Sequence, residues 1–285
     1  MKAGFIGLGA MGQGMARNLA KAGVLAAVCN RTLAKVSALA SELNVVACPD
    51  PQILAAQVDV VLICVSADQD VLDVVSAVAQ TIKPGSVVID LSTVSAQTAR
   101  AAAAMLADRQ AAFLDAPVSG GVEGANNGKL VMMVGGDAAV LQRVRPILGS
   151  MTSRIELMGN IGAGQACKAV NQVMAAGIAQ AVTEALAFGQ ALGLDMDKVV
   201  DLVAGGAAGN WFLQHRGKTL MQGIFKPGFK LALHHKDLRI CQQMADNVGM
   251  ALPLTDVTVD DYAELMQQGH GDDDISALFR LKRTT

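Results

Sequence analysis

The feature that most restricts the fold of this chain is a glycine-rich turn close to the N-terminus. A short, mainly apolar run at residues 2–7 leads into GLGAMG, and the helix-like segment MARNLAKAG follows; the turn consists of Gly7, Leu8, Gly9, Ala10, Met11 and Gly12. Such a turn between a strand and a helix indicates a parallel βαβ unit. The first glycine permits the tight turn, the second lets backbone approach a pyrophosphate, and the third allows the helix to pack on the strand. Because the helix N-terminus also presents free N–H groups, the segment predicts a dinucleotide-binding turn.

The end of the next predicted strand indicates which dinucleotide is bound. Residues 25–29 form that strand, and Asn30, Arg31 and Thr32 follow it, with Lys35 close behind. An NAD site usually places an acid here to accept from the ribose 2′-hydroxyl, but the first 35 residues contain none. Arg31 instead offers a planar fork for a 2′-phosphate, with Thr32 and Lys35 as helpers. The alternative is a solvated loop cation. The pattern predicts NADP as cofactor, with NAD as the weaker alternative.

Further predicted strands alternate with helical segments through the first half. They share short apolar runs, and they are residues 59–65, 86–91, 112–116, 130–134 and 154–157. This alternation is typical of a doubly wound α/β sheet, in which ligands collect outside the carboxyl ends of the strands. Three of those ends carry polar or glycine-rich segments, which are Val65-Ser66, Ser92-Thr93 and residues 117–121. We expect these segments near the nicotinamide ribose and the substrate.

Ser119, Gly120 and Gly121 are the most informative of these strand-end residues. Two glycines leave backbone N–H groups unshielded and the serine adds a hydroxyl, a combination that suits a small carboxylate without a fixed cation. The alternative is a tight structural turn between the strand and Gly128, and the three residues alone do not decide between the two.

The second half lacks strand signals and begins with a long predicted helix, Gly164–Leu192. Its apolar residues lie on every side, so we expect other elements to cover it almost all round. Lys168 lies in its first or second turn, where the helix dipole disfavours a cation, so helix stability does not account for it. Asn171 follows at i+3 and Gln172 at i+4, on the same face. A snorkelling or salt-bridged lysine is the alternative to a functional one.

The remaining predicted helices form an all-helical second domain. They are residues 197–204, 213–222, 236–248 and 255–268, followed by a short C-terminal helix. The fold class is therefore α/β: a Rossmann-type domain of residues 1–161, and an all-α substrate and dimerisation domain of residues 162–285, joined by the long helix.

Two polar or aromatic groups in the second half have open interpretations. Trp211 ends the glycine-rich stretch GGAAGNW and is either part of the core or the wall of a pocket. Lys236 and Asp237 are either a capping pair at the surface or contribute a cation to a cleft. His234 and His235 are adjacent on a predicted helix and do not face each other, so we expect no metal site.

Composition excludes several classes of function. Hydrophobic residues make up 52% and charged residues 17%, with a net charge of −2, one Trp, one Tyr and seven Phe. This gives neither a basic footprint nor stacking platforms, so we expect no nucleic acid partner. No apolar run reaches 18 residues and no secretory leader is evident. The cysteines lack metal spacing and indicate the reduced thiols of a cytoplasmic protein. Because so much of the chain is hydrophobic, we also expect a homodimer or homotetramer that assembles through the mostly uncharged helical domain.

The chain resembles the β-hydroxyacid dehydrogenase family over essentially its whole length. The motifs that carry the resemblance are GLGAMGQGMARNL, DLSTVS, FLDAPVSGGVEGANNGKL, GAGQACKAVNQ and KDL, in family order. The resemblance implies that Lys168 is the catalytic lysine, Asn171 assists it, and residues 119–121 hold the substrate carboxylate. Lys236 with Asp237 would line the site, and NRT with Lys35 is similar to the NADP-preferring members.

Three departures from the family pattern affect the pocket. Ala96 and Ser66 stand where many members have proline, and Gln172 replaces a second asparagine. They leave open which substrate is used: 2-hydroxy-3-oxopropionate or 3-hydroxyisobutyrate type, or succinic semialdehyde or glyoxylate. An imine reductase usually lacks this lysine, and a 6-phosphogluconate dehydrogenase would need a longer helical half. A non-catalytic dinucleotide-binding protein is the alternative from another class.

The expected chemistry is hydride transfer to a carbonyl carbon. Lys168 would donate a proton to the oxygen in reduction and take it back in oxidation. Burial, with Lys236 nearby, would lower the pKa of that lysine towards working pH.

Overall fold

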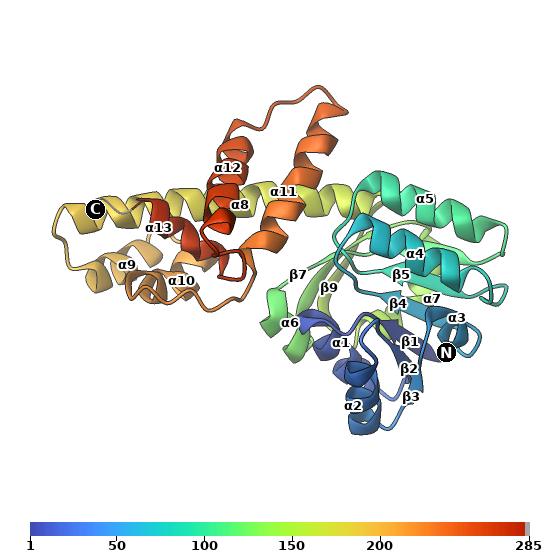
Figure 1. Cartoon of the computed structure of the whole chain (residues 1–285). Coiled ribbons are helices and arrows are strands. Elements are labelled where there is room, and N and C mark those ends of the chain that lie inside the picture. The colour runs from blue at the N-terminus through green and yellow to red at the C-terminus, as the bar shows by residue number, and fades with distance from the viewer. Residues whose placement is uncertain (283–285) are drawn as a thin grey trace. The chain divides into compact units, whose positions relative to one another are not determined.

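The computed structural model of the protein describes residues 1–282, which form two compact units that meet in the chain between Lys168 and Ala169. The first unit contains a mixed sheet with helices on both faces, and the second is helical (Figure 1). The α/β fold class expected from the sequence is confirmed. The division of roles between residues 1–161 and residues 162–285 stays a prediction.

Within residues 1–282, nine strands form one sheet. The strands are β1 (Ala3–Ile6), β2 (Leu25–Cys29), β3 (Val46–Cys48), β4 (Val60–Ile63), β5 (Val87–Asp90), β6 (Ala112–Asp115), β7 (Val118–Ser119), β8 (Leu130–Gly135) and β9 (Thr152–Gly159). Their order is β3-β2-β1-β4-β5-β6-β8-β7, and β9 pairs with β8. The pairs from β3 to β6 are parallel, whereas β8 runs antiparallel to β6 and β7 and parallel to β9. The carboxyl ends of β1, β2, β4, β5 and β6 therefore meet at one edge of the sheet.

Both faces of the sheet are buried, so successive side chains of a central strand enter different cores. Phe5 and Leu62 face one core, and their neighbours Ile6 and Ile63 face the other. The first core is covered by α1 (Ala10–Lys21), α2 (Leu33–Leu43) and α7 (Ala138–Leu148), with α6 (Gly121–Asn127) packed on α1. The second is covered by α3 (Pro51–Ala55), α4 (Asp68–Val78) and α5 (Ala96–Ala107). This burial explains why the strands are continuous apolar runs rather than alternating ones.

The seven strands predicted from the sequence are all present, with ends that differ by a few residues. Two further strands, β3 and β7, were not predicted. The β8 strand also departs from a wholly parallel arrangement: β6 and β7 both run antiparallel to it, so the chain reverses between β7 and β8, where α6 lies.

The second unit is built on α8 (Ala163–Ala191), which starts in the first unit and continues without interruption into the second. The other helices are α9 (Met196–Ala204), α10 (Trp211–Met221), α11 (Leu231–Asp246), α12 (Pro253–Gln267), the 3₁₀ turn Ile275–Leu278 and α13 (Phe279–Lys282). Their shared core includes Leu186, Leu238 and Tyr262. The predicted long helix is confirmed to within one residue at each end.

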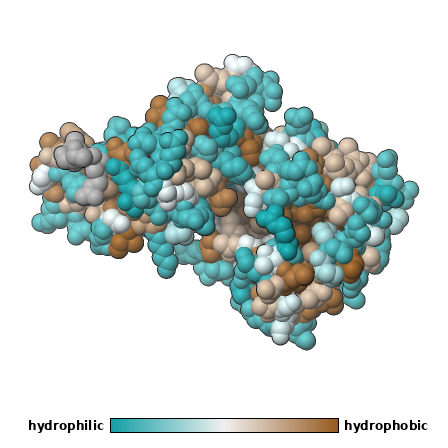
Figure 2. Space-filling view, in the orientation of Figure 1, coloured by the Kyte–Doolittle hydropathy of each residue, from teal (hydrophilic) through white to brown (hydrophobic). Residues whose placement is uncertain are grey.

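Three expectations for the second half were wrong in detail. The helix that carries Lys236 begins at Leu231 rather than at Lys236, and Trp211 is the first residue of α10 rather than part of a loop. Helix α8 is not covered all round by the elements of residues 1–282, because Val170 and Phe188 are 63% and 65% exposed. On the face drawn in Figure 2, hydrophobic side chains are likewise scattered among hydrophilic ones.

No helix within residues 1–282 is long and apolar enough to cross a membrane.

Candidate active site

The glycine-rich turn adopts the geometry that its motif requires. Gly7 has φ +101°, and a Cβ there would overlap the carbonyl oxygen of Cys64; a Cβ at Gly12 would overlap the carbonyl oxygen of Gly7. A Cβ at Gly9, by contrast, would meet no heavy atom within 4 Å. Gly7 and Gly12 are thus needed for backbone packing, while Gly9 borders open space at the start of α1, where a pyrophosphate would fit.

The turn is tied to the end of β2. The backbone N–H of Leu8 donates to Oδ1 of Asn30 at 2.9 Å, so Asn30 holds the loop in place. Helix α1 has no acidic residue in its first turn, and its N-cap, Gly9, makes no side-chain cap hydrogen bond. These N–H groups therefore meet no competing negative side chain before a phosphate arrives.

The cations after β2 are exposed. The side chain of Arg31 is 92% exposed, and its guanidinium is 3.8 Å from Oδ1 of Asp70. A pair at this distance and exposure contributes little and is easily broken by an incoming anion. Thr32 is the N-cap of α2 but makes no cap hydrogen bond with its side chain, and Lys35 lies exposed in the first turn of that helix.

The ends of β4 and β5 are joined by hydrogen bonds. The backbone N–H of Val65 donates to Oγ of Ser92 at 2.9 Å, so the Val65-Ser66 segment is held against the segment that carries Thr93. Beyond it, Oδ1 of Asp68 accepts from the backbone N–H of Ser95 at 2.9 Å and from the Thr98 hydroxyl at 2.6 Å. The predicted segments at these two strand ends therefore form one connected loop layer.

The start of α8 is fixed to the same edge of the sheet by Asp115, the last residue of β6. Its Oδ1 accepts from the backbone N–H of Gly162 at 2.7 Å, and its Oδ2 accepts from that of Gln165 at 2.9 Å. Burial raises the pKa of the Asp115 carboxyl, and the backbone N–H groups oppose that rise. The carboxylate thus caps a helix whose first turn carries no acid of its own.

Gln165 adds a second attachment. Its side chain is 1% exposed, its Nε2 donates to the carbonyl oxygen of Ser92 at 2.9 Å, and its Oε1 accepts from the backbone N–H of Val94 at 3.2 Å. Lys168 follows three residues later on α8 and is 7% exposed. The buried lysine is therefore carried by a helix start that is bonded to the ends of both β5 and β6.

The serine–glycine segment forms a sharp turn into α6. Gly120 has φ +129° and Gly121 φ +61°, conformations that side chains rarely adopt, so both glycines are required by the backbone. Among residues 1–282, the Ser119 hydroxyl has no hydrogen-bond partner. The backbone conformation agrees with a tight structural turn. The hydroxyl of Ser119, unpartnered within the described residues, is also what a carboxylate-binding segment would need.

In the second unit, a line of hydrogen bonds joins α8 to α11. Nδ2 of Asn171 donates to Oε1 of Gln172 at 2.8 Å, and Nε2 of Gln172 donates to Oδ2 of Asp237 at 2.6 Å. Nζ of Lys236 lies 2.8 Å from Oδ1 of Asp237, which is 4% exposed. The structure therefore brings together Asn171, Lys236 and Asp237, the candidates that lie in this unit on α8 and α11.

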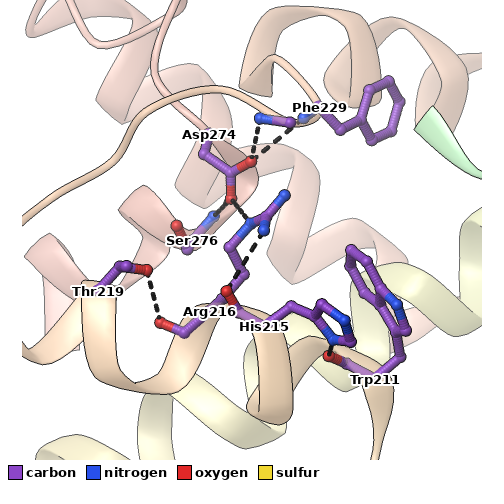
Figure 3. Close-up of polar contacts among 8 residues, drawn as sticks. Trp211, His215, Arg216, Thr219, Phe229, Asp274 and Ser276 are labelled. Atoms are coloured by element: carbon purple, nitrogen blue, oxygen red, sulfur yellow. Dashed lines mark hydrogen bonds and ion pairs between the residues drawn. The ribbon is translucent and has the colours of Figure 1, made fainter. Parts of the chain in front are cut away.

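Trp211 is not a core residue, since it is 57% exposed. Its ring stacks on His215 with centroids 4.2 Å apart, and the guanidinium of Arg216 lies 5.4 Å from its centroid (Figure 3). Asp274 fixes Arg216 at 3.2 Å and also accepts from the backbone N–H groups of Gly228 and Phe229. Trp211 thus stands at the surface on a well-supported helix start.

The comparisons with known proteins cover both halves of the chain. The model for the NAD binding domain of 6-phosphogluconate dehydrogenase matches residues 2–159, and the model for the NAD-binding domain of NADP-dependent 3-hydroxyisobutyrate dehydrogenase matches residues 162–282. A 2-hydroxy-3-oxopropionate reductase of Escherichia coli (strain K12) is 37% identical, over 90% of this chain and 88% of its own length. The chain belongs to the β-hydroxyacid dehydrogenase family.

Solved structures of this family share the whole fold. A 3-hydroxyisobutyrate dehydrogenase of Mycobacterium tuberculosis, solved with L-serine, is 32% identical with a TM-score of 0.89, and 99% of each chain is covered. Psf3, solved in complex with NADP+ and 2-OPP, is 25% identical with a TM-score of 0.88, covering 98% of this chain and 99% of its own. As a β-hydroxyacid dehydrogenase family member, the protein is an NAD(P)-binding oxidoreductase.

Three residues that organise the site of this family member were missed in the sequence. Asp115 and Gln165 anchor the start of α8, and Asp68 ties the loop after β5. Gln165 carried a usable signal, because it is a polar side chain three residues before Lys168 in an otherwise apolar segment. Asp115 had a weaker one, as an acid that ends a buried strand. Within residues 1–282, no group of three or more His, Cys, Asp or Glu side chains is placed to hold a metal ion.

Proposed function

We propose that this member of the family is an NADP-preferring β-hydroxyacid dehydrogenase. It interconverts a small β-hydroxy carboxylate and its semialdehyde, of the 2-hydroxy-3-oxopropionate or 3-hydroxyisobutyrate type. Lys168 serves as the acid/base, and Asn171 assists it.

The observation that carries the proposal is the burial of Lys168 on an anchored helix. An ammonium that is 7% exposed in the N-terminal turns of a helix opposes the helix dipole, so it does not improve the stability of that helix. Its helix is held in place by Asp115 and Gln165, which fixes the lysine relative to the ends of β5 and β6. An acid/base must be held in this way to reach one oxygen atom of the substrate.

The nicotinamide dinucleotide would supply or accept the hydride. Its pyrophosphate fits the N–H groups of the turn at residues 7–12, above the open space at Gly9. Arg31, Thr32 and Lys35 bind the 2′-phosphate of NADP, and the exposed, weakly paired guanidinium of Arg31 supports this role. Val65, Ser66 and Thr93 contact the nicotinamide ribose from the ends of β4 and β5.

The substrate carboxylate is held by Ser119 and the backbone N–H groups of Gly120 and Gly121. The absence of a partner for the Ser119 hydroxyl among the described residues supports this assignment. Trp211, Lys236 and Asp237 are assigned to substrate binding as well, and Lys236 to cofactor binding. A succinic semialdehyde or glyoxylate reductase is the alternative within the family. We assign the protein to the cytoplasm and expect a homodimer or homotetramer.

The decisive experiment compares the wild-type chain with Lys168→Ala on a panel of substrates. The panel consists of tartronate semialdehyde, succinic semialdehyde, glyoxylate and methylmalonate semialdehyde with NADPH or NADH, and of 3-hydroxyisobutyrate and serine in the reverse direction. We expect Lys168→Ala to lower kcat by about a hundredfold or more, because an acid/base contributes at least that factor, while NADPH affinity stays near wild type.

The control is Lys83→Ala, an exposed lysine in the turn before β5, which is expected to keep wild-type kcat. A Lys168→Ala enzyme with more than about a tenth of wild-type kcat would refute the acid/base role. If the wild-type chain binds NADPH but turns over no member of the panel, the non-catalytic dinucleotide-binding alternative is favoured.

A further inference from the structure

Gln172 is a buried amide that α11 holds at two points. Its side chain is 2% exposed and donates through Nε2 to Oδ2 of Asp237 at 2.6 Å. Its backbone carbonyl oxygen lies 3.2 Å from Nε2 of His234, one turn earlier on α11. Neither its main chain nor its side chain can therefore shift without breaking a buried hydrogen bond.

The hydrogen bonds of His234 have a fixed direction. A carbonyl oxygen only accepts, so Nε2 of His234 carries the proton that points at Gln172. In the neutral imidazole the other nitrogen, Nδ1, accepts from the hydroxyl of Tyr262, which is 3.0 Å away. Burial raises the pKa of Tyr262 well above its usual value, so its phenol keeps the proton that this bond needs.

The side-chain hydrogen bonds of Gln172 have a fixed direction too. A carboxylate only accepts, so Asp237 attracts the NH₂ group of the Gln172 amide, and Oε1 must point the other way. Oε1 then requires a donor, and Nδ2 of Asn171 provides it at 2.8 Å. Lys236, 2.8 Å from the second oxygen of Asp237, keeps that carboxylate compensated.

We propose that Gln172 is a positioning residue that relays the direction of hydrogen bonding from Asp237 to Asn171, so that Asn171 offers its carbonyl oxygen Oδ1 to the reaction. Asn171 is three residues after Lys168 on α8, a spacing that places two side chains on neighbouring positions of one helix face. An acceptor at this position binds a hydroxyl group of the substrate or the ammonium of Lys168 and disfavours a carboxylate.

This inference rests on the proposed function, because it assigns an orientation to Asn171 in that reaction. It also accounts for glutamine at this position. An asparagine side chain is one methylene shorter, whereas the glutamine amide spans from Asn171 on its own helix to Asp237 on α11. The orientation of Asn171 determines whether the reacting oxygen of the substrate meets a hydrogen-bond donor or an acceptor there.

The test reverses the direction of the relay. Asn171→Asp alone places an acceptor opposite Oε1 of Gln172, and we expect kcat/KM to fall at least about tenfold. Asp237→Asn supplies a donor, which allows the Gln172 amide to turn over. In the double variant we therefore expect kcat/KM to be about tenfold higher than the value obtained by multiplying the two single-variant effects. We also expect its unfolding midpoint to fall by less than the sum of the two single-variant decreases.

The same cycle is repeated in a Gln172→Met background, where no relay remains and we expect the two changes to be additive in both measurements. Additive effects in the presence of Gln172, or coupling that survives Gln172→Met, would overturn the proposal. The unfolding midpoint requires no turnover, so it decides the relay even if the wild-type chain acts on no substrate of the panel. Absence of turnover on the whole panel would count against the proposed function but not against the relay.

A matched control lies further along α8. Gln180 is 6% exposed and donates through Nε2 to Oδ2 of Asp261 on α12 at 2.8 Å, which reproduces the glutamine–aspartate pair without an asparagine beside it. Gln180→Met is expected to lower the unfolding midpoint about as much as Gln172→Met but to retain wild-type kcat/KM. Equal losses of kcat/KM in the two variants would show that Gln172 is merely structural.

Discussion

Asp115 makes a quantitative prediction about how the lysine is held. Asp115→Asn keeps the size of the side chain but replaces one accepting oxygen by an NH₂ group. That group would face the backbone N–H of either Gly162 or Gln165, and the carboxylate lies so close to Gly135 that a Cβ there would overlap it, so the side chain has no room to move away. One charge-assisted hydrogen bond is lost, and one buried N–H is left without an acceptor.

Each of these losses is worth about 1–3 kcal/mol. The burial that raises the pKa of Asp115 shows that the wild-type carboxylate carries a desolvation cost, and Asp115→Asn removes that cost. We therefore expect the variant to lose, in net, about 2 kcal/mol of unfolding free energy. For a unit of this size, that corresponds to a fall of roughly 4–8 °C in the unfolding midpoint. We expect kcat to fall as well, since Lys168 follows on the same helix.

Differential scanning calorimetry of the full chain measures the midpoint, and Asp137→Asn is the control. Asp137 caps α7 with a hydrogen bond from the backbone N–H of Val140 at 2.9 Å, but it is exposed, so its replacement should cost no more than about 1 kcal/mol. If Asp115→Asn lowers the midpoint no more than Asp137→Asn, the anchoring argument is refuted.

Three further predictions concern the cofactor, the substrate and pH. Arg31→Asp should shift the ratio of kcat/KM for NADPH and NADH towards NADH, and Arg109→Asp, at an exposed arginine before β6, should not; an unchanged ratio for Arg31→Asp would remove Arg31 from the 2′-phosphate site. Trp211→Ala should raise KM for the substrate while changing the free energy of unfolding by less than about 1 kcal/mol, because the side chain is largely exposed, and an unchanged KM would exclude its assigned role. Burial raises the pKa of Tyr262, so the folded state keeps a proton that the unfolded chain loses near pH 10, and stability should fall as pH rises above that value. Tyr262 is the one tyrosine in the sequence, so absorbance at 295 nm reports it directly; a midpoint near pH 10 with an unchanged circular dichroism spectrum would contradict the prediction.

Elements with a strong local pattern were predictable, and those that depend on distant partners were not. The GLGAMG turn and the apolar strands carry their signals within a few residues. The β3 strand has three residues, of which Val46 is exposed, and β7 has two, so neither gives a pattern. The start of α11 was missed because its N-cap, Lys230, makes no side-chain cap hydrogen bond that a sequence signature could indicate.

The candidate site shows the same division. Lys168 and Asn171 could be selected because they are polar residues on one face of an apolar helix. Their supports could not, since Asp115 contacts residues about 50 positions away, and Gln172 meets Asp237, 65 positions away. The sequence also does not reveal which way an amide points, because that direction is set by the charge of its neighbour.

The three glycines of the first turn have different tolerances for change over evolutionary time. Gly7 and Gly12 are packed against backbone atoms, so any side chain there disturbs folding whether or not a ligand is present. Gly9 has extended backbone angles, φ −72° and ψ −170°, that any residue can adopt, and it faces open space. In the proposed function, the close approach of a bound dinucleotide is the reason to keep this position small. A descendant of this protein that no longer used the cofactor would therefore drift first at position 9, while positions 7 and 12 stayed glycine.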